Sequence, residues 1–237
     1  MKAAAKSRTV ALLGDDAVTK LENSCVAVVG LGGVGGHVVE MLARAGVGKL
    51  VLIDCDEVEE SNLNRQIIAT TATLGMPKAE AAKKRVLEIN PLADVVALNA
   101  RFCEADAEKL ICKEVDYIAD CIDSIQDKVS LVCFAKERGI PVISACGAGN
   151  RSALCDFEIC DVYKTQYDPL ARKLRSLLKK AGVRKLDVCY TKELPQKTAG
   201  VASVPYNPAA CGIKMGGYIV LALINRIHIG KNKTENV

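Results

Sequence analysis

A run of apolar residues that breaks into glycines near position 30 constrains the fold of this chain more than any other feature. The β-favouring residues Cys25 to Val29 are followed by Gly30, Gly32 and Gly35 in the spacing G-x-G-x-x-G. A short apolar run bounded by glycine predicts a buried strand. Glycines at this spacing permit a tight turn, close approach of the backbone to a phosphate, and close packing of the following helix.

A second signal, an acidic residue at the end of the next apolar run, supports a nucleotide site here. The N-terminus of the helix after the turn attracts anions through its free N–H groups and its dipole. Residues 49–54 form another apolar run that ends in Asp54, at the distance where a ribose hydroxyl is usually held. Because a lone glycine-rich turn also occurs as a plain connection, Asp54 is needed for the inference.

Strand-like and helix-like segments alternate up to residue 145. The expected strands are 25–29, 49–54, 94–98, 116–121 and 140–145, and the expected helices are 34–45, 76–90, 104–113 and 128–138. Such alternation is typical of a parallel sheet with helices on both faces. The sequence therefore predicts an α/β fold with a Rossmann-like, doubly wound, mainly parallel sheet.

The pattern changes after residue 146. We expect strands over 156–162 and 187–191, a helix over 168–181 and an apolar helix over 208–227. These segments would form a C-terminal α+β extension and an apolar C-terminal helix. The expected organisation is an N-terminal arm and helix in 1–24, a nucleotide-binding core in 25–150, a substrate-side extension of the same domain in 151–229, and a polar tail in 230–237.

Composition disfavours several classes of protein. Half of the 237 residues are apolar and the net charge is +4, but no apolar run approaches the ~20 residues of a membrane span. No signal segment opens the sequence, so we expect a soluble, cytoplasmic protein without a membrane partner. The eleven cysteines include no C-x-x-C pair, which disfavours structural zinc, and the two histidines disfavour a Ser-His-Asp arrangement.

Polar residues beyond the second strand distinguish a triphosphate site from a nicotinamide site. Asn62, Arg65 and Lys78 have no evident role in a dehydrogenase, whereas cations and amide donors stabilise the charge that develops when a triphosphate is cleaved. Asp123, just past the fourth expected strand, is a carboxylate suited to Mg²⁺. We expect a nucleoside triphosphate and Mg²⁺ at this site.

Four segments together resemble a known family. They are the G-x-G-G-x-G run at 30–35, the segment 61–66 (SNLNRQ), Lys78 and the segment 120–123 (DCID). The chain from about Arg8 to Ala145 is similar to the ATP-dependent adenylating domain of ubiquitin-activating enzymes and of bacterial adenylyltransferases of thiamine and molybdopterin synthesis. The resemblance implies that the glycine run, including Gly32 and Gly33, approaches the phosphates.

The same resemblance implies roles for the polar residues. Asp54 would hold the ribose, and Asp123 would serve the Mg²⁺. The residues that would contact the triphosphate are Asn62, Arg65 and Lys78. A basic residue of the arm, Arg8 or Lys6, would act at the ATP of a partner subunit, which implies a homodimer.

Three further motifs narrow the resemblance to one branch. They are the arm motif that begins at Arg8, the segment 147–150 (GAGN) and the segment 161–172 (DVYKTQYDPLAR). Over nearly the full length the chain looks like the branch of tRNA threonylcarbamoyladenosine dehydratases. Members activate the carboxylate of the threonyl group on a modified adenosine in tRNA with ATP, and the adenylate then closes to a cyclic form. One departure is Gly36, where a serine is common.

The helix over 168–181 carries an uneven charge. Seven basic residues and no acidic residue lie between Arg172 and Lys185. Such a run is either an ordinary solvated face or a surface for the phosphates of RNA. The residues that we assign to tRNA contact are Arg172, Lys173, Arg175 and Lys179.

Three other functions stay open from the sequence. An adenylyltransferase for a small sulfur-carrier protein would need a thiolate, for which Cys189 and Cys211 are candidates, and some relatives have sulfur-relay partners. A nicotinamide-dependent oxidoreductase would use the same glycine turn. A non-catalytic nucleotide-sensing module would bind ATP without turnover.

Overall fold

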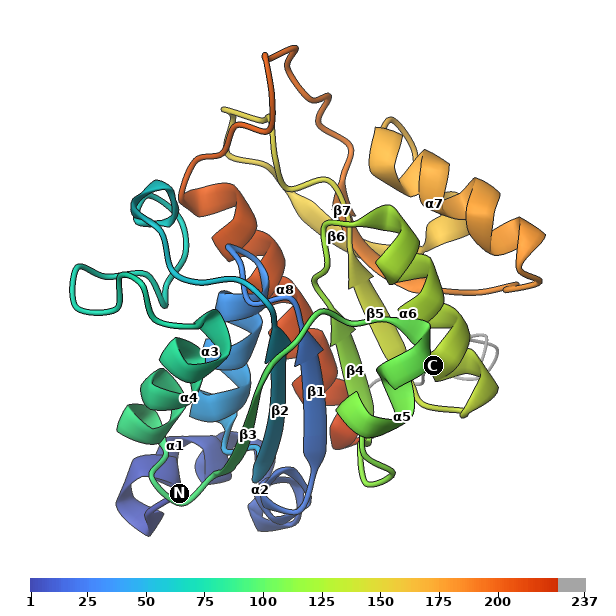
Figure 1. Ribbon diagram of the computed structural model, residues 1–237. Coiled ribbons are helices and arrows are strands. Elements are labelled where there is room, and N and C mark those ends of the chain that lie inside the picture. Colours follow the sequence, from blue (N-terminus) through green and yellow to red (C-terminus); the bar gives the residue numbers. More distant parts are fainter. Residues whose placement is uncertain (226–237) are drawn as a thin grey trace.

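The computed structural model describes residues 1–225, which form one seven-stranded sheet with helices on both faces (Figure 1). The strand order is β3-β2-β1-β4-β5-β7-β6. The strands are β1 (Cys25–Val29), β2 (Lys49–Asp54), β3 (Asp94–Asn99), β4 (Tyr117–Asp120), β5 (Val142–Ala145), β6 (Phe157–Asp161) and β7 (Asp187–Thr191). The prediction of a doubly wound, mainly parallel α/β sheet is confirmed.

All neighbouring strands are parallel except β6, which runs antiparallel to β7. Every residue of β1 is buried because helices cover both faces, which explains its continuous apolar sequence. In the register, Val29 of β1 lies between Ile53 and Asp120 of its two neighbours. The carboxyl ends of β1, β2 and β4 therefore meet at one edge.

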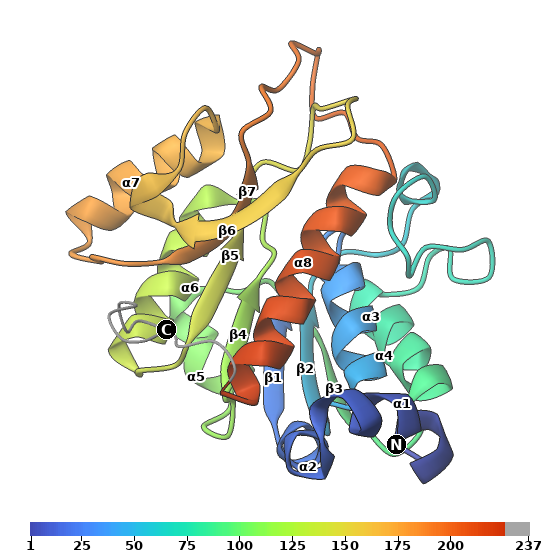
Figure 2. The same ribbon diagram turned by 180° about the vertical axis from the view of Figure 1, so that it is seen from behind.

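One face of the sheet is covered by α3 (Gly35–Ala45), α4 (Lys78–Ile89) and α8 (Tyr206–Leu223) (Figure 2). Small residues let α8 approach α3 closely. A Cβ atom on Gly212 would overlap the carbonyl oxygen of Val34, and one on Gly216 would lie 2.6 Å from Cβ of Met41. The last described helix is thus packed against the helix that follows the glycine turn.

The other face is covered by α5 (Ala107–Leu110), α6 (Ile125–Glu137) and α7 (Pro169–Lys180). The helix expected over 104–113 is shorter than predicted. It consists of the 3-10 turn η2 (Glu104–Asp106) and α5, and Ile111 is already extended so that the chain can turn toward β4. The 3-10 turn η3 (Val162–Lys164) connects β6 to the segment before α7.

The expectation of a polar arm before one helix is wrong, because residues 1–24 contain two helices. These are α1 (Ala3–Leu13) and α2 (Asp15–Glu22). From the sequence, Asp15 or Asp16 is the expected N-cap of the second helix, but Gly14 is the N-cap and both aspartates lie in its first turn. Three successive alanines at 3–5 favour a helix where the polar residues alone suggested an arm. The helix α8 overlaps the range expected over 208–227, but it begins at Tyr206 and ends at Leu223. Residues 226–237, including the end of that expected helix and the expected tail, lie outside the described residues. Among residues 1–225, no helix is long and apolar enough to cross a membrane.

Candidate active site at the carboxyl edge of the sheet

Gly30 and Gly35 are required by packing at the turn between β1 and α3. Gly30 has a φ of 87°, and a Cβ atom on it would lie 2.6 Å from the carbonyl oxygen of Cys121. A Cβ atom on Gly35 would overlap the carbonyl oxygen of Gly30. A side chain at either position would push α3 away from the strand ends.

Gly32 and Gly33 lie at the more open part of the same turn. Apart from chain neighbours, a Cβ atom on Gly32 would have one described atom within 4 Å, Nε2 of Gln66 at 3.9 Å. A Cβ atom on Gly33 would lie 3.0 Å from Pro208 and 3.6 Å from Cγ of Arg65. The backbone at Gly32 therefore leaves room for a ligand, and Arg65 lies beside the turn.

Asp54 joins the end of β2 to the glycine turn. One carboxylate oxygen accepts a hydrogen bond from the N–H of Leu31 at 2.6 Å, and the other accepts one from the N–H of Asp56 at 2.9 Å. Both bonds fix the orientation of the carboxylate. Each oxygen keeps further acceptor capacity for a ligand hydroxyl.

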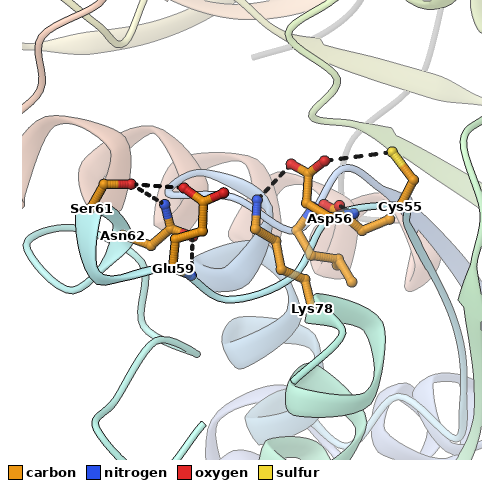
Figure 3. Close-up of polar contacts among 8 residues, drawn as sticks. Cys55, Asp56, Glu59, Ser61, Asn62 and Lys78 are labelled. Atoms are coloured by element: carbon orange, nitrogen blue, oxygen red, sulfur yellow. Dashed lines mark hydrogen bonds and ion pairs between the residues drawn. The ribbon is translucent and has the colours of Figure 1, made fainter. Parts of the chain in front are cut away.

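Lys78 is the first residue of α4, and its side chain points toward Asp56 (Figure 3). The ammonium nitrogen lies 2.7 Å from Oδ2 of Asp56. The lysine side chain is buried, whereas that of Asp56 is 62% exposed. The hydrogen bond from Lys78 holds the pKa of Asp56 below its usual value. A cation is thus fixed at this edge of the sheet.

Asn62 and Arg65 belong to the turn that starts with η1 (Glu60–Asn62). The buried side chain of Asn62 accepts a hydrogen bond from the N–H of Glu59 and donates one to the hydroxyl of Ser61 (Figure 3). The backbone carbonyl of Asn62 accepts a hydrogen bond from the N–H of Arg65. The guanidinium of Arg65 donates to the carbonyl of Ser61 at 2.7 Å and to Oδ1 of Asn64 at 2.9 Å. Asn62 therefore orders the turn that carries Arg65.

The end of β4 holds a buried ion pair that the sequence did not indicate. Nζ of Lys128 on α6 lies 2.8 Å from Oδ2 of Asp120, and both side chains are completely buried. Burial lowers the pKa of Lys128, but the charge and hydrogen bond of Asp120, together with the neighbouring Cys146 and Cys121, outweigh burial, so the pKa is raised. Oδ1 of Asp120 accepts from the N–H of Ile122, which shapes the turn leading to the exposed Asp123.

A segment between β7 and α8, residues 192–205, is fastened to two loops of this edge. Asn150 donates its N–H to the carbonyl of Ala202 at 2.7 Å, and its Oδ1 accepts from the N–H of Ala202. From the other side, Nδ2 of Asn64 donates to the carbonyl of Ser203 at 3.2 Å. The segment is therefore linked to the loops after both β5 and η1.

The loop after β5 is held by a second buried ion pair that sequence reasoning missed. Arg151 donates to the carbonyls of Gly147 and Gly149 and lies 3.3 Å from Oδ2 of Asp168. Asp168 also caps α7 by accepting from the N–H of Ala171. The motifs at 147–150 and 161–172 therefore meet in space. Asp168 belongs to the second motif, but the sequence did not indicate its partner Arg151.

The N-terminal cations lie apart from the glycine turn within this chain, since α1 and α2 are at the opposite end of the sheet (Figure 1). Lys6 donates to both carboxylate oxygens of Glu22, at 2.8 and 2.9 Å. The side chain of Arg8 is exposed and forms no hydrogen bond or ion pair with any residue in 1–225.

The four basic residues assigned to tRNA on α7 are not equivalent. Arg172, Lys173 and Lys179 are exposed. The guanidinium of Arg175 instead donates to the carbonyl of Thr165 at 2.6 Å and to its hydroxyl. Its charge is used to fix the end of η3, so Arg175 is not a free surface cation.

All eleven cysteines are free thiols. Cys189 and Cys211 are completely buried, and the side chain of Cys189 together with burial raises the pKa of Cys211 well above its usual value. Cys55 is exposed at the site, but burial of its sulfur and the charge of Asp56 raise its pKa. Within residues 1–225, the one group with ligand atoms close enough for a metal ion is Asp54, Cys55 and Asp56.

The edge therefore combines an open glycine backbone, two cations and several carboxylates. Backbone N–H groups and cations suit the negative charges of a polyphosphate, and a free carboxylate suits a hard metal ion. The residues that the structure gathers here are Gly32, Gly33, Asp54, Asn62, Arg65, Lys78 and Asp123.

Comparison with known proteins agrees with this arrangement. The ThiF family profile matches residues 5–232. The tRNA threonylcarbamoyladenosine dehydratase of Bacillus subtilis (strain 168) is 36% identical over 249 residues, covering 97% of this chain and 98% of the relative. That of Escherichia coli (strain K12) is 36% identical over 171 residues, covering 72% of this chain and 64% of the relative.

Solved structures give the same result. The crystal structure of the Escherichia coli tRNA N6-threonylcarbamoyladenosine dehydratase in complex with AMP has a TM-score of 0.89 and 30% identity, and it covers 95% of this chain and 97% of that chain. The same protein in complex with ATP has a TM-score of 0.87. This chain therefore belongs to the ThiF family and, within it, to the family of tRNA threonylcarbamoyladenosine dehydratases.

Proposed function

We propose that this protein uses ATP to adenylate the carboxylate of threonylcarbamoyladenosine in tRNA and promotes its cyclising dehydration. The observation that carries the proposal is the meeting of the open glycine turn, Arg65 and the buried Lys78 at one edge of the sheet. The carboxylate attacks the α-phosphorus, pyrophosphate leaves, and a group of the substrate then displaces AMP from the acyl carbon. One water is lost from the nucleoside in total.

The chain's own residues would bind and orient the nucleotide. The backbone N–H groups at Gly32 and Gly33 would donate hydrogen bonds to the phosphates. Asp54 would accept hydrogen bonds from the ribose hydroxyls, while the bond that it accepts from the N–H of Leu31 fixes the turn. Arg65 and Lys78 stabilise the negative charge that develops on the phosphates during transfer. Asn62 holds Arg65 in place indirectly, because its hydrogen bonds with Glu59 and Arg65 fix the conformation of η1 and the turn after it.

Asp123 fits the role of a Mg²⁺ ligand. Its carboxylate is exposed at the end of β4, and no hydrogen bond or ion pair occupies it within residues 1–225. Carboxylate oxygen is the ligand that Mg²⁺ prefers. When bound, the ion would neutralise charge on the phosphate oxygens.

The cyclisation needs no nucleophile from the protein, because the attacking group is already part of the substrate. The burial of the two candidate thiols agrees with a mechanism that uses no thiolate of the protein. Cys189 and Cys211, which a sulfur-carrier adenylyltransferase would need, are completely buried, and the raised pKa of Cys211 keeps it protonated. The burial of these two thiols therefore favours the dehydratase over the adenylyltransferase for a sulfur-carrier protein.

Two surfaces complete the proposal. The exposed cations Arg172, Lys173 and Lys179 of α7 contact the phosphates of tRNA. In a homodimer, Arg8 contacts the nucleotide of the partner subunit, because Lys6 is already bound to Glu22 and Arg8 is free within the described chain.

The test is incubation with ATP, Mg²⁺ and tRNA that carries threonylcarbamoyladenosine, followed by mass analysis of the nucleosides. We expect loss of one water from the modified nucleoside, with release of AMP and pyrophosphate. Reactions without ATP, and reactions with Lys78→Ala, are the controls. Unchanged nucleoside together with binding of NAD(H) would instead support the oxidoreductase.

A further inference from the structure

Gln66 is a buried amide without a partner. It follows Arg65 in the chain, its residue is 6% exposed, and Oε1 is buried with no hydrogen bond. Nε2 donates no hydrogen bond to any residue within 1–225 either. Leaving a buried polar group unpaired is costly, and such groups in folded proteins call for an explanation.

The other polar atom of this amide, Nε2, lies beside the glycine turn. Nε2 lies 3.9 Å from the position that a Cβ atom on Gly32 would take, and it is the one described atom within 4 Å on that side of the turn apart from chain neighbours. The amide therefore borders the space that the absence of a side chain at Gly32 leaves open. A ligand packed against the backbone of Gly32 would come within reach of Nε2.

Other unpaired groups in the described chain do not share this position. Asn90 ends α4, Tyr117 begins β4 and Ser144 lies inside β5, and each has a buried oxygen without a partner. None of them is a neighbour of the Cβ position at Gly32. Asn90 is the best match to Gln66, because it is also a buried primary amide, but it lies at the far end of α4 from Lys78.

We propose that Gln66 is a further nucleotide-contact residue, whose Nε2 donates a hydrogen bond to a phosphate oxygen of ATP that lies against Gly32. The inference rests on the proposed function, since it requires a polyphosphate at the glycine turn. A hydrogen bond to a charged acceptor is stronger than one to a neutral acceptor, so a phosphate would give Nε2 a strong partner that it lacks in the ligand-free protein.

Two variants test the contact by calorimetric titration with Mg²⁺–ATP, with thermal unfolding of the ligand-free protein as a second measurement. Gln66→Met keeps the length and removes the donor, and we expect the Kd for ATP to rise roughly tenfold. Gln66→Glu keeps the shape and places a negative charge near the phosphates, so we expect a larger rise. The Tm of the ligand-free Gln66→Met protein should stay equal or increase, because an unpaired amide is removed. Asn90→Leu is the control and should leave the Kd unchanged.

The outcomes separate the two proposals. If wild-type protein binds ATP and both Gln66 variants bind it equally well, Gln66 is a buried structural amide and the inference is wrong. A large fall in Tm of the ligand-free Gln66→Met protein, with an unchanged Kd, would also overturn it. If the wild-type protein shows no binding of ATP, the proposed function fails instead.

Discussion

The ammonium of Lys78 and the carboxylate of Asp56 form an ion pair at 2.7 Å in the ligand-free protein. The lysine side chain is buried and the aspartate side chain is largely exposed, so the ion pair fixes the ammonium at the site while the site stays open to solvent. A phosphate that enters the site therefore competes with Asp56 for the same ammonium. Exchange of one anionic partner for another avoids an unpaired buried charge at either stage.

We predict that Arg65→Ala and Lys78→Ala each lower the rate of ATP-dependent turnover by roughly a hundredfold, corresponding to about 3 kcal/mol of lost transition-state stabilisation. Single-turnover assays with modified tRNA measure the effect, and circular dichroism checks the fold. Lys84→Ala, an exposed lysine on the same helix, is the control. Near-normal turnover in both variants would remove the triphosphate assignment.

A second prediction concerns the metal. Asp123→Asn keeps the shape but removes the charge that a hard cation prefers, so it should raise the Mg²⁺ concentration needed for half-maximal activity more than it raises the apparent Kd for ATP. Asp16→Asn, an exposed carboxylate at the opposite end of the sheet, should change neither. An unchanged Mg²⁺ titration for Asp123→Asn would make this residue a structural strand end.

A third prediction concerns α7. Combined replacement of Arg172, Lys173 and Lys179 by Gln should raise the Kd for tRNA, and each lost phosphate contact should flatten the salt dependence of binding by about one unit of slope. Filter binding over a range of salt concentrations measures both. The Kd for ATP should not change, because the glycine turn is untouched.

Arg175 lies on the same helix but should behave differently from the three exposed cations. Because its guanidinium is bonded to Thr165, Arg175→Gln should lower the Tm while it leaves the salt slope for tRNA nearly unaltered. A triple variant with unchanged tRNA affinity and slope would show that α7 is an ordinary solvated surface.

The sequence predicted the sheet because its signals are local. Apolar runs, glycines and Asp54 lie close together in the chain, and the candidate residues Asp54 and Asp123 stand at or just past the ends of predicted strands. The ion pair between Asp120 and Lys128 was not foreseeable, since a lysine in a helix of mixed polarity has no pattern that marks it as buried. The pair between Arg151 and Asp168 depends on two loops meeting in space.

Composition also misled at the N-terminus. Polar residues in 1–14 suggested an arm, but a helix can form there without burying any residue, as α1 does. Conversely, Arg175 looked equivalent to its neighbours because charge alone does not show which cation has a partner within the fold.

The close packing of α8 on α3 gives a stability prediction. Gly212→Ala and Gly216→Ala should each destabilise the protein by about 1–3 kcal/mol, because the added methyl group meets Val34 or Met41. Gly217→Ala on the same helix meets nothing within 4 Å and should stabilise it by about 0.5–1 kcal/mol. Urea unfolding of the three variants measures the difference in sign.

The buried ion pair between Lys128 and Asp120 gives another stability prediction. Lys128→Met leaves the carboxylate of Asp120 buried without its partner and should cost about 3–5 kcal/mol of unfolding free energy. Adding Asp120→Asn removes that charge, so the double variant should be less destabilised than the sum of the two single variants. Additive effects in this double-mutant cycle would contradict coupling between the two residues.

The contact between Pro208 and the position of Gly33 joins residues that are 175 places apart in the chain. During synthesis on a ribosome, the glycine turn and its strands emerge long before α8 does. A nascent chain that ends before residue 206 would have α3 exposed along the face where Gly212 and Gly216 pack. We therefore expect the candidate site at this edge of the sheet to be the last part of the molecule to acquire its final shape, so that a truncated product would bind nucleotide poorly even with Gly32, Arg65 and Lys78 present.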